Sequence, residues 1–174
     1  MHLRNSTIVG LTLLAVLSRL IPHPPNFACV GAIGLFAGAY FRSPLALLVP
    51  LAALLASDAL IGFYSPLVMA FVYSGFVIGA AIGRIWLRTR VRAPRLIALS
   101  LFNSGVFFVL SNFGCWLAGM YPPTVDGLVT CYVMALPFLA NTVVGDLLFA
   151  AALFGGYELV RRWAARRAIA WEAA

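Results

Sequence analysis

The chain has 174 residues, of which 63% are hydrophobic and only 10% are charged, and its formal net charge is +7. A soluble globular domain is about 45–50% apolar and about 25% charged, so this composition excludes a soluble domain and predicts an all-α, polytopic membrane protein. The positive charge comes from arginines at the ends of apolar runs. The positive-inside rule accounts for that placement, and no nucleic-acid partner is expected.

Six transmembrane helices are predicted along the chain, because a spanning helix needs about 20 apolar residues. Cut at prolines, glycines and charges, the sequence places them at residues 6–21, 27–41, 44–62, 66–87, 96–119 and 127–160. The first is expected to be a retained helix, since no small-residue cleavage site follows it. Pro137 interrupts the last, and its segment 127–136 could cross the membrane, re-enter it or lie in the interface.

The arginines predict how the helices are oriented in the membrane. They gather between the fourth and fifth helices and after the sixth, whereas the connections HPPN, GFYS and GMYPPTVDG contain no lysine or arginine. Arg4 and Arg42 fall on the same side as these clusters. The positive-inside rule therefore predicts that both termini are cytoplasmic. Residues 1–162 are expected to form one transmembrane domain, and residues 163–174 a basic amphipathic tail in the membrane interface.

Two of the predicted helices carry glycines at a four-residue spacing, which places the glycines of each helix on one face. The second helix contains Gly34 and Gly38, and the fourth contains Gly75, Gly79 and Gly83. Rows of small residues let helices approach closely in a bilayer. These rows indicate either packing within the bundle or a docking face for a partner protein.

Polar side chains within the predicted helices gather toward the outer end of the bundle. A charge in a membrane helix is costly and usually faces a partner or a water-filled cavity. Arg19 lies there with two candidate counter-charges, Asp58 and Asp146, while the inner half offers little beyond Ser100 and Asn103. We therefore expect an outward-facing ligand pocket. Its predicted lining is Arg19, His23, Asn26, Asp58, Tyr64, Asn112, Trp116, Tyr121, Asn141 and Asp146.

No motif in the chain predicts catalysis or a bound cofactor. The candidate reactive groups are Asp58, Asp146, His23 and Cys115, and no H-E-x-x-H or G-x-S-x-G pattern accompanies them. The three cysteines form no C-x-x-C pair, which indicates neither a zinc site nor a disulfide framework. We therefore expect a protein that is not an enzyme and has no metal site.

Several segments resemble an uncharacterised family of small bacterial inner-membrane proteins. They are RLIPHPPNF after the first helix, SDALIGF closing the third, SNFGCWL closing the fifth, and GLVTCY…PF…NTVVGD leading into the sixth. The six-helix pattern of that family is similar to the S components, the substrate-binding subunits of energy-coupling-factor transporters. Within that group it resembles most the solitary cobalamin transporters, which work without a dedicated ATPase module.

This resemblance implies an S-component-like bundle in the bacterial inner membrane, with an external pocket that captures a vitamin-like molecule. His23 and Asp58 match the region where a loop histidine and a third-helix aspartate contribute to the cobalamin site. The chain departs from that pattern because no cysteine follows Asp58 to ligate cobalt. Gly10 and Ala15 are also five residues apart, which breaks the small-residue row by which S components dock on their membrane partner. Cobalamin is therefore one candidate substrate among several.

Two functions from different classes follow from these patterns. The leading hypothesis is a transport protein that captures a vitamin-like small molecule from outside and moves it inward, with or without an energy-coupling module as partner. The alternative is a structural or assembly protein that packs on partner helices through its glycine rows. Membrane lipid is a partner in either case.

Overall fold

The computed structural model describes residues 5–41 and 43–172, and every regular element within them is helical. The six α-helices are α1 (Asn5–Leu20), α2 (Val30–Tyr40), α3 (Val49–Ile61), α4 (Pro66–Ile82), α5 (Ala93–Leu117) and α6 (Val125–Glu172). A 3-10 helix, η1 (Pro44–Leu48), leads into α3, and a π-helical turn, η2 (Gly83–Leu87), ends α4. Arg4 and Arg42, which contributed to the predicted orientation, lie outside the described residues.

Three helices in the described part of the chain are long and apolar enough to cross a membrane. They cover Pro66–Leu87, Ala93–Leu117 and Val125–Arg166. The remaining apolar helices, α1, α2 and α3, are shorter than a typical span. The described part of the chain is thus all-helical, and its three long apolar helices indicate a membrane protein.

The expectation that Pro137 interrupts the last helix is wrong. Helix α6 passes through Pro137 and runs for 48 residues, which is about 72 Å at 1.5 Å per residue. A proline removes one backbone hydrogen bond, but ending the helix in an apolar surrounding would leave several backbone groups without partners. Residues 127–136 are therefore part of α6, and residues 163–172 continue the same helix.

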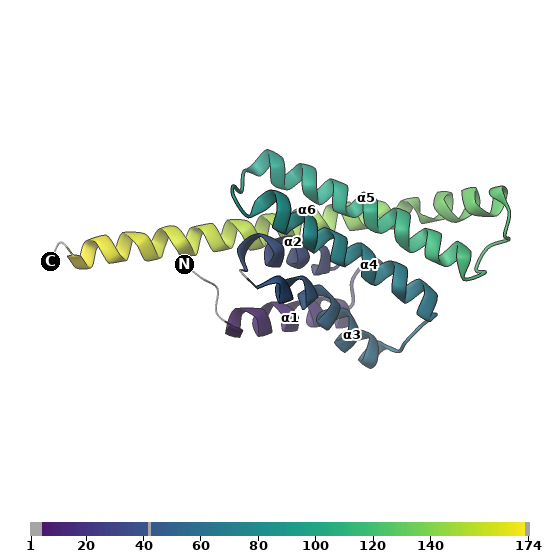
Figure 1. Cartoon of the computed structure of the whole chain (residues 1–174), viewed down its shortest axis with the longest axis horizontal. Helices are drawn as coiled ribbons and strands as arrows, with labels where there is room; N and C mark the ends of the chain where they lie inside the picture. Colours follow the sequence, from purple (N-terminus) through teal and green to yellow (C-terminus); the bar gives the residue numbers. More distant parts are fainter. Residues whose placement is uncertain (1–4, 42, 173–174) are drawn as a thin grey trace.

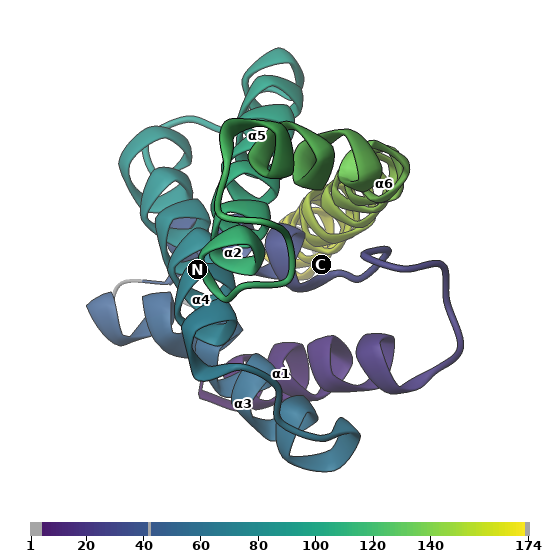
Figure 2. The same cartoon turned by 90° about the vertical axis from the view of Figure 1, so that its right-hand side faces the viewer.

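Helix α2 lies at the centre of the bundle, and every residue from Val30 to Ala39 is buried. Seen end-on in Figure 2, α4, α5 and α6 surround it on one side, and α1 and α3 lie together on the other. Its residues Ile33, Leu35 and Phe36 form the middle of the main apolar core. A helix covered on all sides can be apolar around its whole circumference, as this one is.

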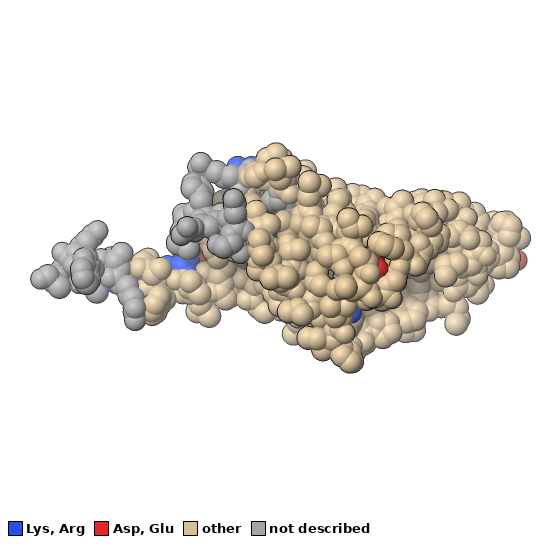
Figure 3. Space-filling model, turned by 90° about the horizontal axis from the view of Figure 1, so that it is seen from below, with Lys and Arg blue, Asp and Glu red and all other residues tan. Residues whose placement is uncertain are grey.

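The chain alternates between the two ends of the bundle (Figure 1). The start of α1, the arginine-rich connection between α4 and α5, and the end of α6 point toward one end, on the left of Figure 1. The connections after α1, α3 and α5 lie toward the other end. Between the ends, the surface in Figure 3 carries few charged atoms.

The glycine rows lie against other helices of the same chain. A Cβ built on Gly38 would come within 2.1 Å of the Ala80 carbonyl oxygen of α4, and one on Gly83 within 2.4 Å of the Leu35 carbonyl oxygen of α2. Gly34 faces the same α4 backbone, while Gly75 and Gly79 face α5. The single row expected on α4 therefore serves two neighbours, because the helix passes between α2 and α5.

Candidate functional site

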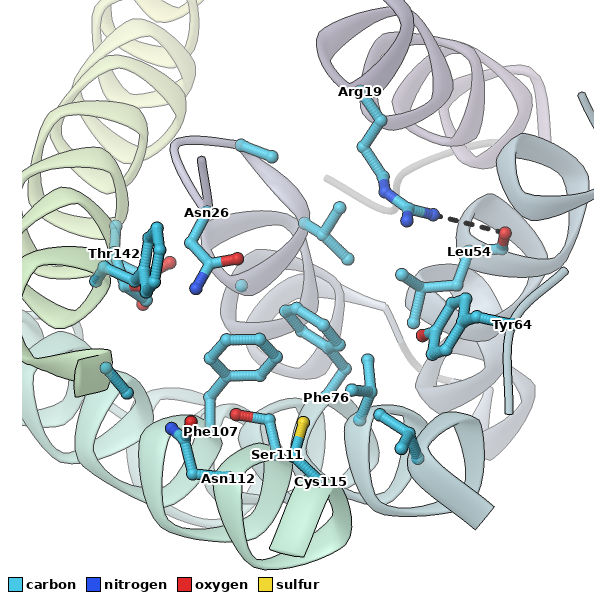
Figure 4. A pocket seen from close by; sticks show the side chains of 18 of the residues that line it. Arg19, Asn26, Leu54, Tyr64, Phe76, Phe107, Ser111, Asn112, Cys115 and Thr142 are labelled. Carbon is cyan, nitrogen blue, oxygen red and sulfur yellow. Dashed lines mark hydrogen bonds between the residues drawn. The ribbon is translucent and has the colours of Figure 1, made fainter. Parts of the chain in front are cut away.

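A cavity of about 540 Å³ opens among all six α-helices, next to the connections that contain no arginine (Figure 4). It is bounded by seven of the ten residues that the sequence predicts as ligand contacts. These are Arg19, His23, Asn26, Tyr64, Asn112, Tyr121 and Asp146. These residues come from α1, α5, α6 and the three connections after α1, α3 and α5, and they converge on one cavity. That they contact a ligand stays a prediction.

The other three predicted contacts lie beside the cavity and hold parts of its wall. Asp58 pairs with Arg19 through a 2.7 Å contact between Oδ1 and Nη2. Asn141 donates a hydrogen bond from Nδ2 to the Pro25 carbonyl oxygen at 3.0 Å. Trp116 donates from Nε1 to the Pro122 carbonyl oxygen at 2.9 Å. Their side chains therefore support the site without lining it.

The ion pair between Arg19 and Asp58 joins α1 to α3 at the edge of the cavity. Asp58 is 1% exposed, and its second oxygen accepts a 2.8 Å hydrogen bond from the Tyr73 hydroxyl of α4. Arg19 also donates to the Leu54 carbonyl oxygen at 3.3 Å and to the Ser57 hydroxyl. A buried charge needs this kind of complete pairing, so the counter-charge that the sequence left open is Asp58.

The segment between α1 and α2 forms the rim of the cavity. Its three prolines prevent the helix from continuing, and Asn26 takes a left-handed backbone conformation with φ of 64°, which asparagine tolerates better than most residues. The His23 ring nitrogen Nδ1 lies 2.6 Å from the Ile21 carbonyl oxygen. Together with the contact from Asn141, these features place the Asn26 side chain in the cavity, as Figure 4 shows.

Three phenylalanine rings line the cavity, and the sequence pattern did not identify them. Phe76 of α4 and Phe107 of α5 pack at 5.0 Å between ring centroids with an interplanar angle of 41°. Both rings are labelled in the middle of Figure 4. Phe138 of α6 adds a third ring to the lining. In an apolar helix a phenylalanine that faces a cavity has the same sequence signature as one that faces the core or lipid, so no local signal separates them.

Tyr64 approaches the cavity from the connection between α3 and α4. Partial burial raises the pKa of its hydroxyl to about 12, and the nearby Asp58 charge contributes in the same direction. The Tyr64 hydroxyl is therefore neutral at any physiological pH and can donate a hydrogen bond into the cavity.

The most buried polar residue that lines the cavity is Asp146, which is 3% exposed. Its Oδ2 lies 2.7 Å from the Ser104 hydroxyl of α5. Asp146 Oδ1 and Asn103 Nδ2 both lie over Gly31 of α2, where a Cβ would come within 2.3 and 2.9 Å of them. Gly31 therefore leaves room for the carboxyl and amide to meet above α2.

This cluster corrects the expected distribution of polar residues. Asn103 and Ser100 were expected in the inner half of the bundle, and Asp146 in the outer half. In the structure Asn103 contacts Asp146. The backbone carbonyl of Ser100 accepts a 3.0 Å hydrogen bond from the Ser104 hydroxyl, which also contacts Asp146. Counting residues from helix ends does not align one helix with another, because α6 extends far past its neighbours. The polar groups reach the middle of the bundle and do not stop in its outer half.

The described residues contain no group of three or more histidine, cysteine, aspartate or glutamate side chains placed to hold a metal ion. The arrangement instead combines aromatic walls with a few hydrogen-bonding groups, which is the general form of a site for a small organic molecule.

Comparison with known proteins identifies the family of the chain but assigns no function to it. No curated protein and no solved structure matches the chain. The family model that matches covers residues 1–168 and is described as a family of unknown function, DUF6580. Since the match spans nearly the whole chain, the protein belongs to the DUF6580 family.

Proposed function

We propose that the protein captures a vitamin-like small molecule from outside the bacterial inner membrane and moves it inward. The observation that carries this proposal is the cavity of about 540 Å³, in which aromatic walls meet separate polar groups from α1, α5 and α6. Sites for small molecules and cofactors measure about 300–1,000 Å³ and combine mostly apolar walls with a few placed polar groups. A protein that only filled space in the membrane would gain nothing from such a cavity, since unfilled volume in a bundle costs packing energy.

The position of the cavity favours capture from the outside. It adjoins the connections after α1, α3 and α5, which contain no lysine or arginine, while arginines lie at the opposite end. By the positive-inside rule the arginine-rich end, with both chain termini, is cytoplasmic. The cavity then opens toward the periplasm.

In this proposal all six helices are embedded in the membrane. Helix α2 is short but is covered by other helices, so it need not span the hydrocarbon core by itself. Helices η1 and α3 follow one another over Pro44–Ile61, and their rises of about 2.0 and 1.5 Å per residue add to about 30 Å. Six embedded helices and an external pocket are what the resemblance to S components implies.

The glycine rows favour capture over the assembly alternative. Gly34, Gly38 and Gly83 are occupied at the contact of α2 with α4, and Gly75 and Gly79 at the contact of α4 with α5. These faces are therefore used within the chain. Gly10 on α1, in contrast, lies on an open face, because an added Cβ there would meet no atom within 4 Å. This face of α1 is free to contact an energy-coupling module, which is therefore an additional partner to test for.

Native mass spectrometry of the protein purified from rich medium tests the proposal. We expect one bound small molecule per chain in the wild type and its loss in Val72→Trp, which fills the cavity from α4. The matched control is Val109→Trp, because Val109 of α5 is 52% exposed and does not line the cavity. Absence of any bound molecule in the wild type, or equal binding in both variants, would contradict the proposal.

A further inference from the structure

Asp146 has no ion-pair partner within the described residues, although it is 3% exposed and lines the cavity. The salt bridges of that part of the chain join Arg19 to Asp58 and two arginines to Glu158. An ionised carboxylate in such a place, held only by neutral groups, is costly. Its neighbours Ser104 and Asn103 are both uncharged.

If Asp146 is ionised, the Ser104 hydroxyl has too few protons to make both of its hydrogen bonds. The Ser104 hydroxyl has one proton, yet its oxygen lies 3.0 Å from the Ser100 carbonyl oxygen and 2.7 Å from Asp146 Oδ2. A proton on Asp146 Oδ2 satisfies both contacts, since the acid donates to Ser104 and Ser104 donates to Ser100. Two more buried oxygens in this cluster, Ser100 Oγ and Asn103 Oδ1, also lack a described partner. The Asn103 oxygen can only accept a hydrogen bond.

No other titratable side chain faces Asp146 from the helices packed against it, within the described residues. On α2 the titratable residue is Tyr40, which packs on Tyr157 at 4.3 Å between ring centroids and is about 13 Å along the helix from Gly31. On α5, Arg95 and Cys115 lie more than two turns from Ser104 in either direction. Cys29, before α2, directs its thiol to Ser18 of α1 at 3.2 Å.

The cavity itself is lined by other charged or titratable residues besides Asp146. These are Arg19, His23, Tyr64, Cys115 and Tyr121.

We propose that Asp146 is a proton-binding site, a neutral carboxylic acid at neutral pH that exchanges its proton with water in the cavity. Binding adds one proton to Oδ2 and removes one negative charge from the bundle, and no other reactant takes part. Ionisable groups within membrane bundles commonly serve as proton relays in transporters. Resting on the proposed function, this site makes the proton the ion whose binding is coupled to substrate capture and release.

Infrared spectroscopy of the protein reconstituted in liposomes tests this site through the C=O stretch of a protonated carboxyl group. The chain contains only five aspartates and glutamates, which makes an assignment feasible. We expect the band in the wild type at neutral pH, its loss on alkaline titration, and its complete absence in Asp146→Asn. Asp126→Asn, at the exposed start of α6, is the matched control and should keep the band. A wild type without the band, or a band that persists in Asp146→Asn, would overturn the proposal.

A second variant covers the case in which Asp146→Asn does not fold. Ser104→Ala removes the hydroxyl next to Asp146 Oδ2 and should move the frequency of the same band without abolishing it. An unmoved band would assign the protonated carboxyl to another residue and refute the site. The infrared measurement needs no ligand, so it can fail while native mass spectrometry still finds a captured molecule. Conversely, the band can be present at Asp146 while no captured molecule is found, which would contradict only the proposed function.

Discussion

Two aspartates are buried in this bundle, and their surroundings differ in every respect that matters for charge. Asp58 on α3 has an arginine at 2.7 Å and a tyrosine hydroxyl at 2.8 Å. Asp146 on α6 has a serine hydroxyl, an amide and a glycine. The first carboxyl lies behind Arg19 and does not line the cavity, whereas Asp146 lines it.

The difference separates a carboxylate with a structural role from a carboxyl whose protonation state can change. The pair of Arg19 and Asp58 has no net charge, and its hydrogen bonds fix α1 against α3. Asp146 has no such compensation among the described residues, so its state depends on a proton or on what enters the cavity. A sequence shows both residues as single acids in apolar helices, and only the packing distinguishes them.

The largest effect is expected from breaking the ion pair. Asp58→Asn leaves Arg19 without a counter-charge and should lower the free energy of unfolding by about 3 kcal/mol, the lower end for a buried pair because Arg19 is 19% exposed. The double variant Arg19→Met with Asp58→Leu should recover most of this loss. Thermal unfolding in detergent measures both. If the single variant were neutral, the pair would not anchor α1.

A smaller loss is expected from crowding the Asp146 cluster. In Gly31→Ala the new Cβ would lie 2.3 Å from Asp146 Oδ1, and such overpacking costs about 1–3 kcal/mol. Gly105→Ala is the matched control, since a Cβ there meets no atom within 4 Å and should stabilise the helix by up to about 1 kcal/mol. The two melting temperatures should therefore move in opposite directions, and equal shifts would show that Asp146 does not pack on Gly31.

The hydrogen bond that supports Asp58 should contribute less than its ion pair. Tyr73→Phe removes the hydroxyl that donates to the carboxylate, and bonds to charged groups contribute about 1.5–3 kcal/mol. Tyr132→Phe removes a hydroxyl that donates to the neutral Val109 carbonyl oxygen at an exposed position, where about 0.5–1 kcal/mol is expected. Chemical denaturation of both variants gives the comparison. A Tyr73 variant no less stable than the Tyr132 variant would argue against a charged Asp58.

The smallest effect is expected from Asp146→Asn. If Asp146 is a neutral acid, the amide has nearly its shape and no charge changes, so the loss should be below about 1 kcal/mol. The same unfolding measurement, set beside that of Asp58→Asn, sharpens the contrast between the two aspartates. A loss as large as that of Asp58→Asn would show that both carboxyls are ionised and equally needed for folding.

Composition and the polar residues within apolar runs are enough to predict an all-helical membrane protein whose buried polar residues gather at one cavity, because each rests on the cost of placing charge or free backbone in lipid. Arg19, Asn26 and Asp146 could be grouped for that reason. The pairing of Arg19 could not be predicted, since two acids occur at similar depth and only the contact of α1 with α3 selects Asp58.

Three other features also lay beyond the sequence. Phe76 and Phe107 face the cavity, but nothing in an apolar helix marks which ring does so. Pro137 was expected to interrupt the last helix, which continues through it. Asn103 joins Asp146 because of how α5 and α6 are offset along their axes, and that offset is set by packing rather than by either helix alone.

Thiol labelling tests most directly whether the cavity opens outward, because Cys115 lines the cavity while Cys29 and Cys131 are buried. A membrane-impermeant maleimide is applied to intact cells and, separately, to inverted membrane vesicles. We expect labelling in cells, its loss in Cys115→Ser and its suppression by Val72→Trp, which fills the cavity. Labelling only in inverted vesicles, or none on either side, would contradict an outward-facing pocket.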